Sequence, residues 1–312
     1  MTESDKNNAM GEEIAQHTAI ISLLFFIVAG IFLIGPMLGS LLSLPFLGFD
    51  ITALTSFVQN LGGDPSQRTA AIAFQGGTAI GAFFVAPWLW LKLVKRRNPS
   101  VYFSGGKVLP LAMFLAVALS FSMMIFNSGL IEWNKGLEFP AFMKGFEEWA
   151  RNAENQADAL SSFMTNFDSF GQFLVGLIVI AGLAGICEEF LFRGVLQTEI
   201  QERSGNIHVA VWVSAFLFSA IHFQFFGFFP RLVLGVVFGY LYAYSGSLWY
   251  PVFAHFLNNA FVVCSAYILG KNTSELSNVT ESTPWYLVVL GLIGTVALMV
   301  WFKSLFPKKK TA

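Results

Sequence analysis

Apolar residues follow one another along this chain in long blocks that are separated by short polar stretches. The blocks lie at about residues 19–42, 70–91, 108–128, 171–192, 208–229, 231–247, 251–269 and 285–304. A helix needs about 20 consecutive apolar residues to cross the hydrocarbon core of a bilayer, which is close to the length of these blocks. The pattern therefore predicts an all-α polytopic membrane protein with about eight transmembrane helices.

The composition agrees with a protein that is surrounded by a lipid bilayer. The chain is 312 residues long and 55% hydrophobic, and only 12% of its residues are charged. A soluble domain usually carries about 25% charged residues, so this chain has too few to cover a water-facing surface. The net charge of −1 gives no indication of a nucleic acid partner.

Basic residues are concentrated in two places and predict the orientation of the chain. Segment 92–107 and the C-terminal tail are rich in lysine and arginine, so both are expected on the cytoplasmic side. With eight spans, both termini then lie in the cytoplasm. The long loop 129–169 carries more acidic than basic residues and is expected on the opposite side. Its mixture of aromatic and acidic residues fits either an amphipathic surface helix or a solvated connector.

The chain divides into four predicted parts. They are a polar N-terminal segment (1–18), three transmembrane helices with the long loop (19–170), a helical core with most of the buried polar residues (171–270), and a last helix with a basic tail (271–312). The first apolar block is too long for a signal peptide, so an uncleaved anchor is expected. Cys187 and Cys264 are interpreted as small core residues.

Charged residues interrupt the fourth apolar block in the sequence EEFLFR, residues 188–193. Each such charge near the centre of a span costs about 2.5–3.5 kcal/mol on the insertion scale, so it needs a partner. Glu189 and Arg193 are four residues apart and share a helix face, where they can form an ion pair. Glu188 is rotated by about 100° from that face and remains available for chemistry. The alternative is a capping cluster at a helix end.

Two histidines also lie inside apolar segments. His222 has Phe218 one turn before it, and His255 has Asn259 one turn after it. A carboxylate and a neutral imidazole can together deprotonate a water molecule, and a second imidazole with an amide N–H can stabilise an oxyanion. These residues therefore predict hydrolysis of an amide bond without a protein nucleophile.

Three other interpretations use the same residues. Glu188, His222 and His255 could bind zinc and leave a position open for water, although no HExxH motif is present. We expect no cofactor. A proton-coupled transporter also needs buried Glu, His and Arg, but no internal repeat supports one. A non-catalytic scaffold or immunity protein would not need the complete set of six polar residues.

The motifs EEFLFR, FSAIH (218–222) and HFLNN (255–259) match EExxxR, FxxxH and HxxxN in that order. Over about residues 171–270 the chain thus resembles the CPBP family, the CAAX prenyl endoproteases and bacteriocin-processing proteins also called the Abi family. This resemblance implies an eight-helix intramembrane glutamate protease that cleaves a membrane-embedded or prenylated peptide. It implies that Glu188 and His222 activate water, that His255 and Asn259 form the oxyanion site, and that Glu189 and Arg193 hold the arrangement together, with Phe218 in support.

Two expectations concern location and geometry. A multi-pass protein of a bacterial inner membrane is favoured, whereas in a eukaryote the sequons at 272–274 and 278–280 and the terminal lysines would suggest the endoplasmic reticulum. The predicted topology places His222 further outward than Glu188 and His255. Helix tilt or an irregular segment within residues 223–230 is therefore needed to bring the three side chains together.

Overall fold

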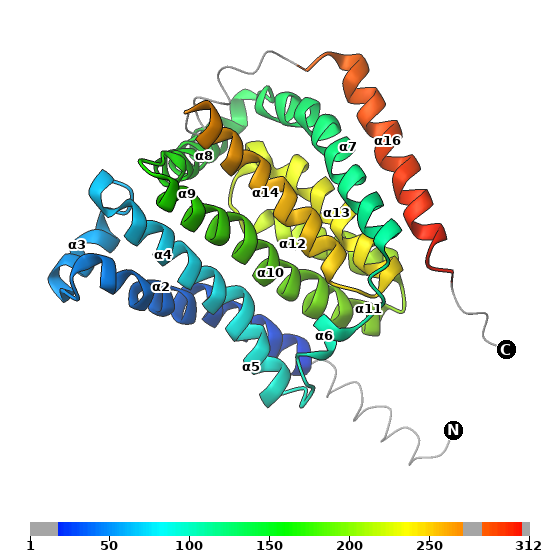
Figure 1. The fold of residues 1–312 in the computed structure, drawn as a ribbon, viewed down its shortest axis with the longest axis horizontal. Helices are drawn as coiled ribbons and strands as arrows, with labels where there is room; N and C mark the ends of the chain where they lie inside the picture. The colour runs from blue at the N-terminus through cyan, green and yellow to red at the C-terminus, as the bar shows by residue number, and fades with distance from the viewer. Residues whose placement is uncertain (1–17, 271–282, 308–312) are drawn as a thin grey trace.

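The structure is a computed structural model that describes residues 18–270 and 283–307 (Figure 1). The predicted N-terminal polar segment up to residue 17, the two sequons and the terminal lysines therefore lie outside the described residues. Every regular element in the described ranges is a helix. The chain is a polytopic membrane protein, as its apolar pattern predicts.

All eight predicted spans contain helix, and within residues 18–270 and 283–307 seven helices are long and apolar enough to cross a membrane. The seven are Thr18–Leu47, Pro65–Leu93, Pro110–Lys135, Phe170–Ser204, Phe225–Ser245, Trp249–Leu269 and Trp285–Ser304. The fifth predicted span, 208–229, is wrong in its length because its helix, α12 (Ile207–Ala220), has only 14 residues. The chain then turns, with Phe223 in the left-handed region at φ 52°, and resumes as the 3-10 helix η8 (Phe225–Gly227). The residues of this turn are as apolar as those of the spanning helices, so the hydrophobic pattern of the sequence does not reveal the turn.

Several long spans are composite. The first contains the π-helix η1 (Gly30–Ile34), α2 (Gly35–Ser43) and the 3-10 helix η2 (Leu44–Leu47), and the second contains the 3-10 helix η3 (Pro65–Gln67), α4 (Arg68–Ala79), the π-helix η4 (Ile80–Val85) and α5 (Ala86–Leu93). The fourth runs through α9 (Phe170–Gly176), the π-helix η6 (Leu177–Leu183), α10 (Ala184–Glu189), the π-helix η7 (Phe190–Gln197) and α11 (Thr198–Ser204). The others are α7 (Pro110–Lys135), α13 (Phe228–Ser245), α14 (Trp249–Leu269) and α16 (Trp285–Ser304). Short helices α3 (Ile51–Gln59) and α6 (Val101–Ser104) lie in the connections.

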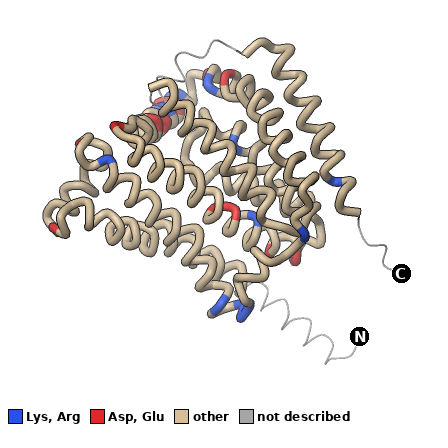
Figure 2. Tube along the Cα trace, viewed as in Figure 1, with Lys and Arg blue, Asp and Glu red and all other residues tan. Residues whose placement is uncertain are grey.

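The long acidic loop forms a helix. Helix α7 continues to Lys135, and after the 3-10 helix η5 (Ala141–Met143) the chain forms α8 (Lys144–Thr165). Of the two interpretations of this loop, the structure therefore has the amphipathic helix. Helix α8 packs on α4, α9, α14 and η8 at the end of the bundle opposite to the basic segment that follows α5 (Figures 1 and 2). Arg68 anchors this end, because it donates a hydrogen bond to the carbonyl of Phe163 and pairs with Asp168.

Helix α14 lies at the centre of the half of the bundle that contains most of the buried polar residues discussed below. It packs against η6 and α10 on one side and against α13 and α7 on the other, while α16 covers the outer face of α7 (Figure 1). Helix α12 packs along α13. The start of the first span and the end of α16 lie at the same end of the bundle as the basic segment (Figures 1 and 2), which is the arrangement that the charge pattern predicts.

Glycines bring the first two spans into backbone contact. Gly35 and Gly39 of α2 face Gly77 of α4 and Gly81 of η4, as in the small-residue interfaces of membrane helices. A Cβ atom on Gly77 would lie 2.5 Å from the carbonyl oxygen of Leu38, and one on Gly81 would lie 2.6 Å from Cα of Gly35. A larger residue at either position must push the two helices apart.

We therefore expect Gly77→Leu to lower the free energy of unfolding by about 1–3 kcal/mol, the usual cost of overpacking. Denaturation of the purified protein in mixed detergent micelles measures this change. Gly145→Leu in α8 is the matched control, because a side chain at Gly145 enters open space. Equal unfolding free energies for the two variants would contradict the close approach of α2 and α4.

Candidate active site

The two adjacent glutamates occupy the last two positions of α10, a short α-helical segment between two π-helices. At the end of η6 the hydrogen bond that defines a π-helix is present, because the N–H of Ala184 bonds to the carbonyl of Val179, five residues back. Such π-helical segments are rare and are found frequently at functional sites. In this chain they determine which way Glu188 and Glu189 point.

Glu189 and Arg193 form the ion pair that their spacing predicts. Nη1 of Arg193 lies 2.8 Å from Oε1 of Glu189, and both side chains are 0% exposed. The same guanidinium donates a hydrogen bond of 3.0 Å to the carbonyl of Gly235 in α13 and lies 4.6 Å from the ring centroid of Phe218. The pair therefore joins the fourth span to α12 and α13 in the interior of the bundle.

His255 of α14 connects the two glutamates. Its Nδ1 lies 2.8 Å from Oε1 of Glu189, and its Nε2 lies 3.8 Å from Oε2 of Glu188. Phe238 stacks on the imidazole with 5.3 Å between ring centroids. Because a carboxylate can only accept, Nδ1 is the donor to Glu189, and this bond fixes the tautomer and the orientation of the ring.

Glu188 and Glu189 differ in exposure, as their positions on different faces of the helix predict. The Glu188 side chain is 14% exposed, whereas the Glu189 side chain is fully buried behind Arg193 and His255. Among the described groups, His255 Nε2 is the ion-pairing partner closest to Glu188. Glu188 is therefore the acid that is accessible to a water molecule.

His222 lies in the turn directly after α12, immediately before the irregular segment 223–230 that the topology argument requires. Its Nδ1 lies 2.8 Å from the carbonyl oxygen of Phe218, so Nε2 points away from its own helix end. The Phe218 ring lies 5.3 Å from the His222 ring and 6.0 Å from the His255 ring. Phe218 thus contacts both histidines, and within the described residues no hydrogen bond or ion pair joins His222 to Glu188.

Asn259 is tied into the fold. Its side-chain amide donates a hydrogen bond of 3.2 Å to the carbonyl of Ile180 in η6, where the regular helical ladder is interrupted. Its side-chain oxygen accepts a bond of 3.3 Å from the amide of Asn258. One amide N–H is therefore used to join α14 to η6, and the role of Asn259 at an oxyanion stays a prediction.

A further cation, Arg231 of α13, was missed by the sequence analysis. It donates two hydrogen bonds to Gln224, which follows His222 by two residues. The signal was present in the sequence FFPRLVLGVV, where an arginine interrupts an apolar run in the same way as Arg193 does.

The residues named for a zinc site are only partly brought together. Glu188 and His255 are neighbours, but His222 is not a third ligand beside them. In the part of the chain that the structure describes, no three His, Cys, Asp or Glu side chains converge in a way that could hold a metal ion.

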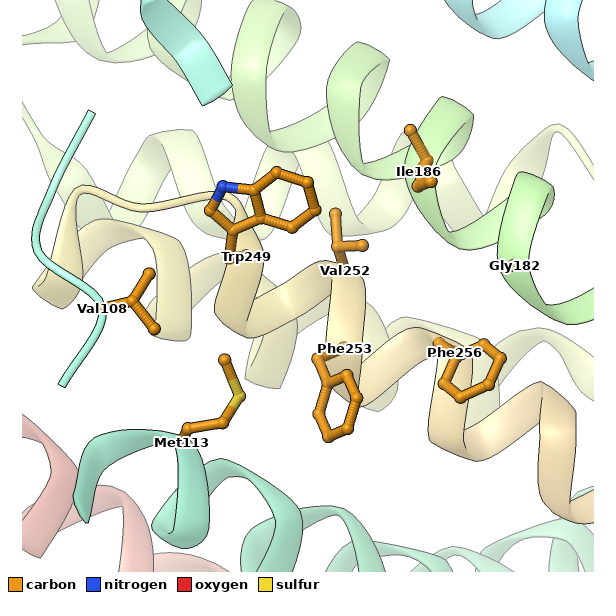
Figure 3. A pocket seen from close by; sticks show the side chains of 8 residues that line it. All are labelled: Val108, Met113, Gly182, Ile186, Trp249, Val252, Phe253 and Phe256. Carbon is orange, nitrogen blue, oxygen red and sulfur yellow. The ribbon is translucent and has the colours of Figure 1, made fainter. Parts of the chain in front are cut away.

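An apolar cavity of about 460 Å³ lies between α7, the fourth span and α14 (Figure 3). It is lined by Val108, Met113, Gly182, Ile186, Trp249, Val252, Phe253 and Phe256. Ile186 precedes Glu188 by two residues, and Val252 precedes His255 by three. The cavity thus borders the two helices that carry the glutamates and the histidine.

Comparison with known proteins supports a specific family for this half of the chain. The family model of the type II CAAX prenyl endopeptidase Rce1-like proteins matches residues 170–261. The uncharacterized protein YpbD of Bacillus subtilis is 32% identical over 92 residues, which are 28% of this chain and 44% of YpbD. The putative membrane peptidase YdiL of Bacillus subtilis is 29% identical over 117 residues, 37% of this chain and 46% of YdiL. The matched part thus spans less than half of each relative, and no solved structure matches the chain. Over residues 170–261, this chain is therefore similar to the Rce1-like type II CAAX prenyl endopeptidases.

Proposed function

We propose that the protein is an intramembrane endopeptidase that hydrolyses a peptide bond of a membrane-associated or lipidated substrate. One observation carries this proposal. Glu188 is partly exposed beside Nε2 of His255, while Glu189 and Arg193 are completely buried behind them. An accessible carboxylate that is held next to an oriented imidazole is the arrangement that general-base hydrolysis needs.

The proposed reaction uses these groups in order. Glu188 accepts a proton from water, and the resulting hydroxide attacks the carbonyl carbon of the scissile bond. The oxyanion accepts hydrogen bonds from donors at the site, for which His255 in its protonated form and the second N–H of Asn259 are our candidates. The C–N bond then breaks, and the proton held by Glu188 passes to the leaving amine. His222 assists Glu188 in orienting the water.

The apolar cavity supports a substrate that carries a hydrocarbon chain. Its lining is almost entirely aliphatic and aromatic, and it borders the helices that hold Glu188 and His255. A lipid chain in this cavity would place an attached peptide beside the site. We further propose a bacterial membrane as the location, because both relatives reported above are bacterial.

The test of the proposed function is the cleavage of a quenched fluorescent prenylated CAAX peptide by the purified protein in detergent, with and without a chelator. The expected result is cleavage that is insensitive to the chelator and that His222→Ala strongly reduces. Sensitivity to the chelator would instead assign Glu188 and the histidines to metal binding. If the wild-type protein did not cleave the peptide, a prenylated substrate would be discarded and a scaffold role would gain support.

Filling the cavity should weaken the binding of a lipidated substrate. Gly182 borders the cavity, and a Cβ atom there would meet only the carbonyl oxygen of Leu177, at 3.9 Å. We expect Gly182→Leu to raise the KM for the prenylated peptide about tenfold, because displacing two methylene groups costs about 0.8 kcal/mol each. Steady-state kinetics with prenylated and unprenylated peptides measure the effect, and Gly182→Ala is the matched control. Equal losses for both peptides would show that the cavity does not hold the lipid chain.

A further inference from the structure

Arg231 is a cation in a membrane-spanning helix, and within the described residues its guanidinium donates hydrogen bonds to the neutral residue Gln224. It is the fourth residue of α13, within the span Phe225–Ser245, and is half-buried. Charged residues in such positions usually pair with an opposite charge or serve a function. The structure gives Arg231 no ion pair with a described carboxylate; its hydrogen-bonded partners are two oxygen atoms of Gln224.

Gln224 stands between this cation and the nearest acid. Nη1 of Arg231 donates to the backbone carbonyl of Gln224 at 3.5 Å, and Nη2 donates to its side-chain oxygen. The Gln224 amide in turn donates a bond of 3.3 Å to Oε1 of Glu154 in α8, whose Oε2 is buried without a hydrogen-bond partner. A guanidinium has five N–H donors in a planar fork that fits a carboxylate. The bonds to Gln224 leave part of that fork available.

The chain provides room for the guanidinium beside the active site. A Cβ atom on Gly227 would lie 2.9 Å from Cζ of Arg231, so any larger residue displaces the guanidinium. The backbone of Gly227, at φ −110°, is open to residues with a side chain, so its glycine is explained by this space and not by the backbone conformation. Gly235, which accepts the hydrogen bond of Arg193, follows Arg231 by four residues in α13. A group that is bound to Arg231 would therefore lie about one helical turn along α13 from the Glu189–Arg193 pair.

We propose that Arg231 binds a carboxylate of the substrate, either the free C-terminus or an acidic side chain, a short distance along the peptide from the scissile bond. The proposal rests on the proposed peptidase function, since it assigns a specificity-determining residue to the same site. Substrate binding breaks no ion pair of Arg231, because the acids of α8, Glu154 and Asp158, act on it only from a distance or through Gln224. The neutral Gln224 orients the guanidinium of Arg231, and the remaining N–H groups of the guanidinium stay available to a ligand.

The test measures binding in an enzyme that leaves the peptide intact. Fluorescence anisotropy with the Glu188→Gln protein compares one prenylated peptide in three forms: with a free C-terminal carboxylate, with a C-terminal amide, and with an amide after a terminal aspartate. The amide form should bind about 10- to 100-fold more weakly than the free acid, the range expected for hydrogen bonds to a charged group. If the peptide with the terminal aspartate bound as tightly as the free acid, a side-chain carboxylate would also bind to Arg231.

Variants of Arg231 decide whether this residue causes the preference. Adding Arg231→Gln to Glu188→Gln should weaken binding of the acid to the level of the amide and leave the amide unchanged. Gly227→Ala should reduce the preference while keeping the charge. Arg151→Gln is the matched control, because Arg151 also lies near η8, 4.3 Å from the Phe226 ring, but already pairs with Glu147.

Two outcomes would overturn the proposal: equal binding of acid and amide to the Glu188→Gln protein, or equal weakening of both by Arg231→Gln. A purely structural role of Arg231 produces the second outcome, and the melting temperature of each variant detects it independently. If Glu188→Gln still cleaved the peptide, the proposed function would fail. The role of Arg231 would then be decided from the cleavage rates of the acid and the amide.

Discussion

Replacing Glu188 by glutamine is expected to abolish peptide hydrolysis, with a loss in kcat of at least about 10²–10⁴-fold, the contribution of a general base. Glutamine has nearly the shape of glutamate but cannot accept a proton from water at neutral pH. The fold should survive, because the buried ion pair is made by Glu189 and not by Glu188. The assay is the fluorescent peptide cleavage described above, with the melting temperature measured on the same preparation.

Cys187→Ser is the matched control for this variant. Cys187 is the buried free thiol next to Glu188 in the same helix, and under the proposed chemistry no thiol takes part. The serine variant should therefore cleave the peptide at the wild-type rate. Loss of activity in Cys187→Ser with retention in Glu188→Gln would reverse the assignment and indicate a thiol peptidase.

Replacing Arg193 by methionine is expected to lower the free energy of unfolding by about 3–5 kcal/mol, because it leaves one charge of a buried pair without compensation. The carboxylate of Glu189 would then keep only His255 as a partner, in a site that is closed to water. Unfolding of the variant in mixed detergent micelles, followed by circular dichroism, measures this change.

The double variant Glu189→Met with Arg193→Met separates the cost of an unpaired charge from the cost of lost packing. Because buried ion pairs are often replaced by apolar residues at little cost, the double variant should recover most of the stability that Arg193→Met loses. It should nevertheless remain inactive, since His255 loses the acceptor that orients its ring. A double variant as unstable as the single one would show that the guanidinium contributes mainly through its packing on Phe218.

Much of the fold follows from the lengths of the apolar blocks, because only a helix can cross a bilayer with all of its backbone groups bonded. The end of α12 does not follow from them. Residues 221–229 are apolar whether they form a helix or a turn, and the turn depends on the positive φ of Phe223 and on packing against α8. The π-helices also leave no pattern in the sequence, since the choice between i→i−4 and i→i−5 bonds is made by tertiary contacts.

For the site, the local geometry could be predicted and the contacts between helices could not. The spacing of Glu189 and Arg193 within one helix defines their ion pair. The bond from His255 to Glu189 and that from Asn259 to Ile180 join α14 to the fourth span, so they depend on how two helices are placed side by side. The contacts of Arg231 could not be predicted for the same reason. The sequence shows an arginine that interrupts an apolar run, but its bond to Gln224, which in turn bonds to Glu154 of α8, depends on how separate elements are placed.

The two π-helices around α10 have a consequence for how this protein can change during evolution. A single-residue insertion or deletion in a helix rotates everything beyond it by about 100°. Because η6 and η7 stand on either side of the glutamates, the direction of Glu188 depends on the number of residues in η6, and the direction of Arg193 on those in η7. Point substitutions leave the number of residues in these segments unchanged. A deletion reduces it and rotates the residues that follow about the helix axis. Relatives can therefore substitute residues in these two segments without changing these directions, but can change the lengths of the segments only by shifts that compensate one another.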